Sequence, residues 1–102
     1  MNNHIFKSNG IYLGFLRGDN YLFSRDGFYL GWIESGYAWD SNGQFCGQLT
    51  KIGQNSYILK NMYAVQPLPK KPKPVPLPLT SILEPQSNIS PISLPFGLAD
   101  GF

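Results

Sequence analysis

Apolar and polar residues alternate in three short stretches of the chain, residues 5–16, 22–33 and 38–49, and an Asn-Gly or Asp-Gly pair divides each stretch. Alternation with a period of two is typical of β-strands, and these dipeptides favour the two-residue type I′ turn of a β-hairpin. No long window free of glycine has the periodicity of a helix. The pattern therefore predicts three β-hairpins. Their expected turn residues are Asn9, Gly10, Asp26, Gly27, Asn42 and Gly43.

The three stretches are copies of one repeat. Their turn glycines, at positions 10, 27 and 43, are 17 and 16 residues apart. A fourth copy begins at Tyr57 but lacks the turn glycine and continues into prolines, as expected of a terminal repeat. Because a single hairpin is marginally stable in water, we expect four hairpins to pack around a shared axis in a small closed all-β structure.

A two-residue turn decides which residues of each hairpin lie opposite one another. We expect one aromatic-aliphatic pair per hairpin on the drier face of the sheet. These pairs are Phe6 with Leu13, Phe23 with Leu30, and Trp39 with Cys46. The opposite face combines polar residues of the first strand with rings of the second strand. Its members are Lys7, Ser24, Asp40, Tyr12, Tyr29 and Phe45.

A glycine recurs on the second strand of each copy. Glycine inside a strand often marks a bend or a close approach of another backbone. We expect a side chain at this position to collide with the neighbouring hairpin, or to flatten the curvature that closure requires. The repeat glycines are Gly14, Gly31 and Gly47, opposite Ile5, Leu22 and Ala38.

The last third of the chain has a different composition, because all nine prolines lie between Pro67 and Pro95. Proline excludes a helix or a central strand here. In an extended chain Val75, Leu77 and Leu79 would point to one side, away from the alternating prolines. Two interpretations stay open: a strap that covers apolar surface of the hairpins, or a polyproline ligand for a domain of the SH3 or WW type.

Four hairpin units, a glycine on each return strand, alternating prolines and the closing residues 94–98 make the chain resemble the bacterial four-fold β-flower proteins over nearly its whole length. The resemblance implies four hairpins arranged like petals around a pseudo-fourfold axis, together with a proline-rich carboxyl-terminal segment, and it implies no biochemical activity. Phe96 stands where a Gly-Trp pair is more usual in that family. We expect a four-hairpin domain in residues 1–64 and an extended segment in residues 65–102 that packs on it.

Charge and length exclude several classes of protein. The 102 residues carry a net charge of +2, and only Lys70, Lys71 and Lys73 are clustered, so a nucleic-acid partner is not expected. No apolar run resembles a signal peptide or a membrane span, which predicts a cytoplasmic protein without a membrane partner. A single cysteine and a single histidine leave no internal disulfide and no clustered metal ligands.

The candidates for catalysis have simpler explanations. His4 occupies the repeat position of Tyr21, Tyr37 and Tyr57, which favours a packing role, and Cys46 lies on the predicted dry face. Asp26 and Asp40 belong to turns or to the strand surface, and the adhesion-type tripeptide at 17–19 links two hairpins. We therefore expect no enzyme, no cofactor and no metal.

The repeated rings leave two hypotheses for function. The first is a structural or protein-interaction module that docks a protein partner or a second copy of itself. The alternative is a binder of a sugar, base or cation. Its rings would be Tyr12, Tyr29 and Phe45, and its polar groups Lys7, Ser24 and Asp40.

Overall fold

The computed structural model describes residues 4–18, 20–76 and 86–102, and this part of the chain contains β-strands and no helix. The prediction of an all-β fold is confirmed. Asp19, Leu77 and Leu79, which entered the predictions above, lie outside the described residues. The strands are β1 (His4–Phe6), β2 (Tyr12–Arg17), β3 (Tyr21–Ser24), β4 (Tyr29–Glu34), β5 (Tyr37–Asp40), β6 (Phe45–Ile52), β7 (Asn55–Asn61) and β8 (Leu98–Asp100).

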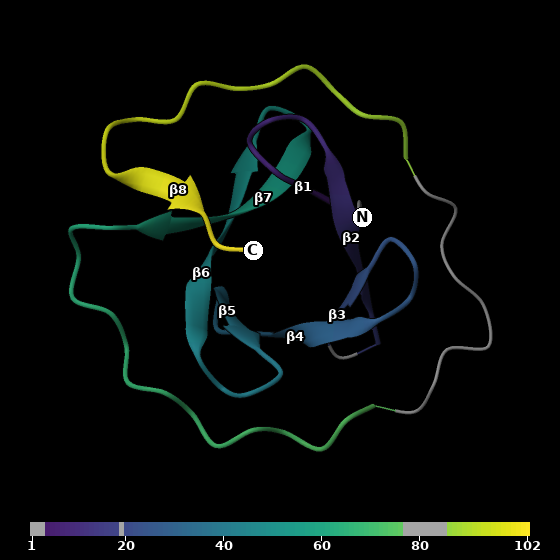
Figure 1. Cartoon of the computed structure of the whole chain (residues 1–102), viewed down its shortest axis with the longest axis vertical. Helices are drawn as coiled ribbons and strands as arrows, with labels where there is room; N and C mark the ends of the chain where they lie inside the picture. Colours follow the sequence, from purple (N-terminus) through teal and green to yellow (C-terminus); the bar gives the residue numbers. More distant parts are fainter. Residues whose placement is uncertain (1–3, 19, 77–85) are drawn as a thin grey trace.

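The strands form one sheet in which each is antiparallel to the next along the chain. Strand β1 also pairs with β7 in parallel, with Ile5 opposite Ser56, and this pairing closes β1 to β7 into a barrel-like ring. Strand β8 pairs with the second half of β7, where Leu59 lies opposite Asp100. Figure 1 shows the hairpins arranged around a centre toward which the carboxyl terminus points.

The two-residue turns predicted at the hairpin tips are wrong. At the first tip the Gly10 N–H donates to the Lys7 carbonyl, and the Lys7 N–H donates to the Ile11 carbonyl, each over 2.9 Å. These bonds enclose a three-residue loop in which Gly10 has a φ of 88° and Asn9 has no positive φ. This is the loop in which a left-handed glycine follows a type I turn. Equivalent hydrogen bonds occur at the tips that contain Gly27 and Gly43.

The pairing predicted for the aromatic residues is also wrong, and the loop explains why. A three-residue loop places Phe6 opposite Tyr12, and a bulge at Leu13 then restores Ile5 to its predicted place opposite Gly14. The second and third hairpins repeat this shift. The glycine pairs are therefore confirmed, whereas the rings of both strands share a face. The observed ring pairs are Phe6 with Tyr12, Phe23 with Tyr29, and Trp39 with Phe45.

The core is built from equivalent positions of the repeat. Ile5, Leu22, Ala38 and Ile58 are buried together, and the bulge residue Cys46 packs with them. The other two bulge residues and Phe102 are partly buried against this cluster. Each bulge therefore directs one apolar side chain into the centre of the barrel-like sheet. The aromatic residue just before it in the sequence stays on the outer face.

Neighbouring hairpins approach so closely at the repeat glycines that there is no room for a side chain. A Cβ atom on Gly14 would lie 1.9 Å from the carbonyl oxygen of Phe23, and one on Gly31 would lie 1.9 Å from that of Trp39. The corresponding distance from Gly47 to the Leu59 oxygen is 2.7 Å. Since a carbon atom cannot approach backbone that closely, glycine at these positions sets the spacing between hairpins.

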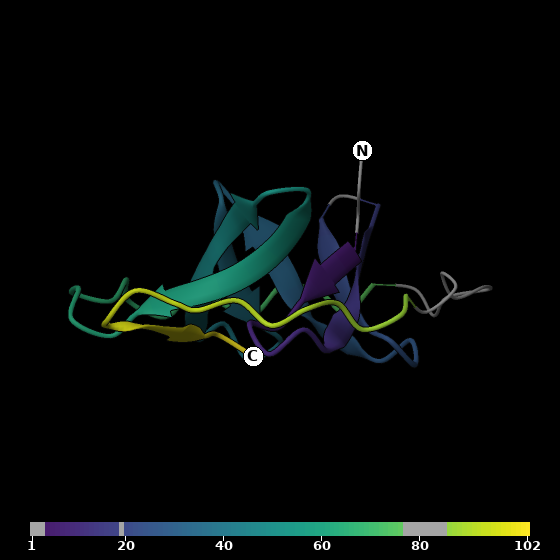
Figure 2. The same cartoon turned by 90° about the horizontal axis from the view of Figure 1, so that it is seen from above.

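The described parts of the proline-rich segment between β7 and β8, residues 62–76 and 86–97, lie along the outside of the hairpins (Figures 1 and 2). Its backbone contacts two hairpin tips: the Lys70 N–H donates to the Gly43 carbonyl over 2.8 Å, and the Ile89 N–H donates to the Gly10 carbonyl over 2.9 Å. Residues 65–102 thus include strand β8 besides the extended segment. The domain division at residues 64 and 65 stays a prediction.

Candidate functional site

The structure places the predicted ligand-binding rings in three separate hairpins, where each contacts rings of its own hairpin. Tyr12 is buried, its hydroxyl lies 3.2 Å from Nδ1 of His4, and burial raises its pKa. Tyr29 is half-buried and its hydroxyl has no hydrogen-bond partner among the described residues, and burial raises its pKa as well. Phe45 is half-buried. The three rings therefore do not form one continuous binding face.

The outer rings of each hairpin form a group of three. One ring of the second strand contacts two rings of the first strand, with centroids 5.5 to 6.0 Å apart. Such edge-to-face and tilted contacts bury the rings against one another. The groups are His4, Phe6 and Tyr12; Tyr21, Phe23 and Tyr29; and Tyr37, Trp39 and Phe45.

The predicted polar residues take part in the hairpin tips. Oγ of Ser24 accepts from the N–H groups of Asp26 and Phe28 over 3.3 and 3.1 Å. Oδ1 of Asp40 accepts from Asn42 and Gln44 in the same way, over 2.8 and 3.0 Å. Lys7 closes the first tip through its backbone. These bonds use the side-chain oxygens locally, which leaves them less available to a ligand.

Hairpins that follow one another along the chain meet at three interfaces, and one pair of facing residues differs in character between them. Phe15 of β2 stacks on Phe23 of β3, with centroids 5.9 Å apart and planes at 22°. Trp32 of β4 stacks on Trp39 of β5 at 6.4 Å and 19°. We call these the first and second interfaces. At the third interface, between β6 and β7, the equivalent paired residues are Gln48 and Leu59.

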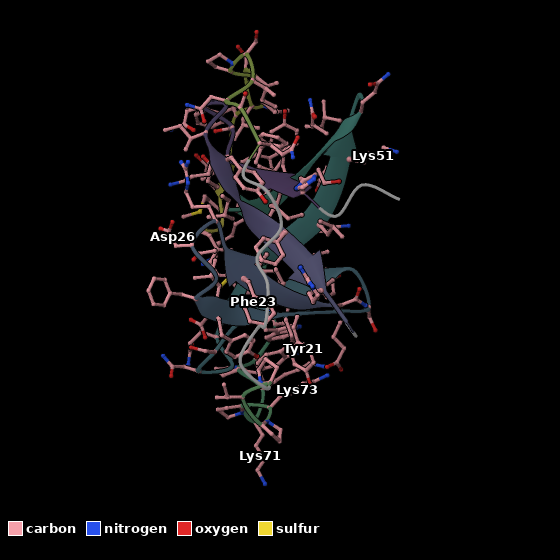
Figure 3. All side chains as sticks on the ribbon, turned by 90° about the vertical axis from the view of Figure 1, so that its right-hand side faces the viewer. Tyr21, Phe23, Asp26, Lys51, Lys71 and Lys73 are labelled. Atoms are coloured by element: carbon pink, nitrogen blue, oxygen red, sulfur yellow. The ribbon has the colours of Figure 1, made fainter. Side chains whose placement is uncertain are left out.

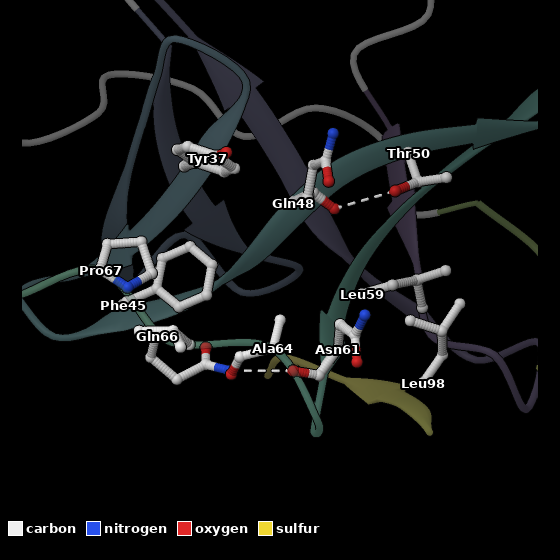
Figure 4. Close-up of a pocket in the computed structure, with 11 residues that line it drawn as sticks. Tyr37, Phe45, Gln48, Thr50, Leu59, Asn61, Ala64, Gln66, Pro67 and Leu98 are labelled. Carbon is white, nitrogen blue, oxygen red and sulfur yellow. Dashed lines mark hydrogen bonds between the residues drawn. The ribbon is translucent and has the colours of Figure 1, made fainter. Parts of the chain in front are cut away.

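A cavity of about 320 Å³ lies at this third interface (Figure 4). Its walls include the rings of Tyr37 and Phe45 on one side and the side chains of Leu59 and Leu98 on the other. Pro67 and the residues just before it, from the start of the proline-rich segment, close another side. The cavity therefore occupies the space that stacked rings fill at the first two interfaces.

The polar side chains of the cavity are amides and the two hydroxyl-bearing residues Tyr37 and Thr50. Asn61 and Gln48 are exposed, and the hydroxyl of Thr50 donates to the Gln48 carbonyl over 3.1 Å. Gln66 donates through Nε2 to the carbonyls of Asn61 and Ala64, over 2.8 and 2.9 Å. Its Oε1 is buried and has no hydrogen-bond partner within the part of the chain that the structure describes. No charged side chain lines the cavity among the described residues.

The second interface is covered by lysines of the proline-rich segment. The ammonium of Lys70 lies 5.1 Å from the ring centroid of Trp39, and that of Lys73 lies 5.6 Å from that of Trp32. Both lysines pair with Glu34, which also accepts from Nε1 of Trp32 over 3.2 Å. The hydrogen bond from Lys70 is the main cause of the lowered pKa of Glu34. Lys71, between the two lysines, points away from the sheet (Figure 3).

The cysteine and the histidine, the two residues with catalytic potential, are held in packing contacts within their hairpins. Cys46 is buried, burial raises the pKa of its thiol to about 11, and the thiol donates to the Gln44 carbonyl over 3.7 Å. A thiol that stays protonated is a poor nucleophile. The ring of His4 packs edge-on against Tyr12. The described residues contain no group of three or more His, Cys, Asp or Glu side chains placed to hold a metal ion.

The described part of the chain also contains no helix that could span a membrane.

The prediction from sequence included Phe45 but missed the other residues of the cavity. Gln48, Thr50, Asn61 and Gln66 were not among the candidate residues, and Tyr37 was noted only for its repeat position. The repeat contained one usable signal: an aromatic residue occupies position 15 and position 32, but a glutamine occupies the equivalent position 48. A glutamine cannot fill the space of a stacked ring, so this departure marks the gap.

Comparison with known proteins identifies one relationship. The family model described as 4-fold beta flower protein matches residues 1–97. No curated protein and no solved structure matches the chain.

Proposed function

The chain belongs to the 4-fold beta flower family, and on this premise we propose that it is a non-enzymatic structural and protein-interaction module. In this proposal four hairpin units surround a pseudo-fourfold axis, and the proline-rich segment completes the fold as a strap. The observation that carries the interaction role is a pair of exposed rings in contact, Tyr63 and Phe96, with centroids 5.5 Å apart and planes tilted by 34°.

The pairing of β7 with the carboxyl terminus supports the fourth unit. The N–H of Gly101 donates to the Ile58 carbonyl over 3.0 Å, and Ile58 is the repeat equivalent of Ile5. A Cβ on Gly101 would lie 2.4 Å from the Cys46 carbonyl oxygen, so this glycine is also crowded. Gly101 therefore corresponds to the repeat glycines, and residues 62–97 take the place of the three-residue tip.

The contacts of the proline-rich segment support its role as a strap. Its backbone N–H groups donate hydrogen bonds to the carbonyls of Gly10 and Gly43 in two hairpin tips. Lys70 and Lys73 also form ion pairs with Glu34. Ser8 of the first tip also bonds to both carboxylate oxygens of Asp100, each over 2.7 Å. A peptide ligand for another domain would need these groups free, so the polyproline interpretation is the less favoured one.

The docking surface in this proposal is the apolar tip formed by Met62, Tyr63 and Phe96. These side chains are 58%, 71% and 93% exposed. Exposed apolar patches of several rings are uncommon on monomeric proteins and often mark contacts with other proteins. Because the three residues carry no charge, nothing in the tip selects a charged partner. A second copy of the chain is the simplest occupant, since the same tip on both copies forms a two-fold contact.

Sedimentation velocity at several protein concentrations tests this function. We expect the wild type to shift toward a dimer as the concentration rises, and the double variant Tyr63→Ser, Phe96→Ser to remain a monomer. Phe28→Ser is the matched control, because Phe28 is a ring exposed by 72% at another hairpin tip. A wild type that is monomeric at every concentration, or a double variant that associates as the wild type does, overturns the proposal.

The alternative function, binding of a small ligand, is favoured by one observation. The rings of the first two hairpins contact one another, whereas Tyr37 and Phe45 of the third also line an open cavity. If the repeated rings bind a small molecule, the third interface is the place where one fits. No catalytic role is proposed, because the single thiol is protonated and buried and the single histidine packs among rings.

A further inference from the structure

The cavity at the third interface results from a local change in an otherwise repeated contact. The backbones of β6 and β7 pair through the same register as the strands of the other two interfaces, with Gln48 opposite Leu59. The other two interfaces place stacked rings at these positions. A volume of about 320 Å³ is near the lower end of the roughly 300–1,000 Å³ of ligand pockets, so the cavity suits a ligand of one or two rings.

The lining of the cavity selects against charge. All its described side chains are uncharged, and Lys70 and Lys73 are occupied by Glu34 and the tryptophan rings of the second interface. A charged group that leaves water needs a partner of opposite charge or several hydrogen bonds. Phosphates and carboxylates are therefore poor ligands. A cation is less favoured, because it would contact only the two rings of Tyr37 and Phe45 on one side and no enclosing cage of aromatic faces.

The polar groups of the cavity suit a ligand with several hydroxyl groups. A carboxamide offers two N–H donors and an oxygen acceptor, so Gln48 can bind adjacent hydroxyls. Oδ1 of Asn61 already accepts from the Tyr63 N–H over 3.0 Å, so Asn61 offers mainly its N–H donors. Gln66 holds the wall of the cavity in place, because its Nε2 donates to the carbonyls of Asn61 and Ala64 and its Oε1 is enclosed by protein atoms. The rings of Tyr37 and Phe45 supply an apolar wall for the C–H face of a sugar.

We propose that this cavity binds a neutral sugar of one or two rings, packed against Tyr37 and Phe45 and hydrogen-bonded to Gln48 and Asn61. A nucleobase is less well matched, because it is flat on both faces and the cavity has rings on one side and aliphatic side chains on the other (Figure 4). Met62, Tyr63 and Phe96 of the apolar tip do not line the cavity. The proposed sugar site can therefore be tested separately from the proposed docking function.

Saturation-transfer NMR and calorimetric titration of the whole protein test this site, with glucose, galactose, N-acetylglucosamine, cellobiose and maltose as probes. The decisive variant is Gln48→Phe, which places a ring where Phe15 and Trp32 stand in the other interfaces and so is compatible with the fold. The matched control is Gln44→Phe. Gln44 is exposed outside the cavity, and the equivalent position of the second hairpin holds Phe28.

We expect saturable binding of at least one of these sugars to the wild type and to Gln44→Phe. Gln48→Phe should weaken that binding about tenfold or more, the change expected when one good contact of 1.4 kcal/mol is lost. Tyr37→Leu should weaken it as well, because the stacking wall is lost. Uridine and tetramethylammonium should not bind. The proposal is overturned if no sugar binds saturably, if Gln48→Phe binds as the wild type does, or if uridine binds in place of the sugars.

Discussion

The second and third interfaces have the same backbone pairing, but stacked rings fill the second and a cavity lies in the third. At the second, Trp32 and Trp39 stack and are covered by the ammonium groups of Lys70 and Lys73. At the third, Gln48 faces Leu59 and a cavity remains. Backbone pairing thus does not depend on the rings. The difference shows that the hairpin spacing and the filling of the space between hairpins are controlled by separate residues, so one interface can be opened without loss of the fold.

The contacts of the proline-rich segment also differ between the two interfaces. Over the second interface the segment places two cations and pairs them with Glu34, whereas at the third its first residues form one wall of the cavity. Cation–π contacts contribute roughly 0.5–1 kcal/mol at exposed sites. The second interface is therefore sealed by rings and charges, and the third is left accessible to a molecule of matching size.

The largest expected effect comes from emptying the second interface. Trp32→Gln gives this interface a glutamine, as in the third, and removes a side chain that is only 1% exposed. We expect a loss of about 3–5 kcal/mol in the free energy of unfolding, as for other large-to-small changes of buried tryptophan. Urea unfolding measures it. Gln48→Ala is the control and should change stability by less than about 0.5 kcal/mol, because Gln48 is exposed.

If Trp32→Gln and Gln48→Ala cost the same, the stacked pair adds nothing to stability and the contrast between the interfaces is lost.

A smaller loss is expected when the spacing itself is disturbed. A Cβ on Gly14 would lie 1.9 Å from the Phe23 carbonyl oxygen, so Gly14→Ala must push the first and second hairpins apart. We expect a loss of about 1–3 kcal/mol, the range for overpacking. Gly47→Ala, at the third interface, should cost less, because its closest contact is 2.7 Å and an adjacent cavity allows movement. Thermal unfolding of both variants measures the difference.

An equal loss in both variants would mean that the cavity gives the third interface no freedom to adjust.

The alternation of apolar residues and the turn glycines were enough to predict the all-β fold, the first three hairpins and the pairing of Ile5 with Gly14. They were not enough for the tip geometry, because Asn-Gly is compatible both with a type I′ turn and with a left-handed glycine after a type I turn. The bulge at Leu13 compensates for the extra loop residue, so the glycine pairing came out right while the ring pairing did not.

The cavity and strand β8 were harder to predict, because both depend on contacts between distant residues. Strand β8 pairs with β7 across residues 62–97, and its sequence, Leu98–Asp100, has no strong strand pattern of its own. The cavity requires β6, β7 and the start of the proline-rich segment to meet. Local periodicity contains no information on contacts between distant segments. On β6 the glutamine at position 48 is the visible departure from the repeat at this interface.

The smallest difference expected between a variant and its control is at the tip of the third hairpin, which the proline-rich segment contacts. Gly43 has a φ of 86°, and a Cβ there would lie 1.9 Å from the Lys70 carbonyl oxygen. Gly36 has a φ of 82° with no atom within 4 Å of its Cβ position, so Gly36→Ala measures the backbone strain alone, about 1–2 kcal/mol. Gly43→Ala should cost about 1 kcal/mol more, because it also displaces the strap and breaks the Lys70 hydrogen bond. The displaced Lys70 would leave the ring of Trp39, so tryptophan fluorescence should change in Gly43→Ala and not in Gly36→Ala. Equal stabilities and unchanged fluorescence would show that the strap does not seal the second interface, and the contrast with the third would then rest on the rings alone.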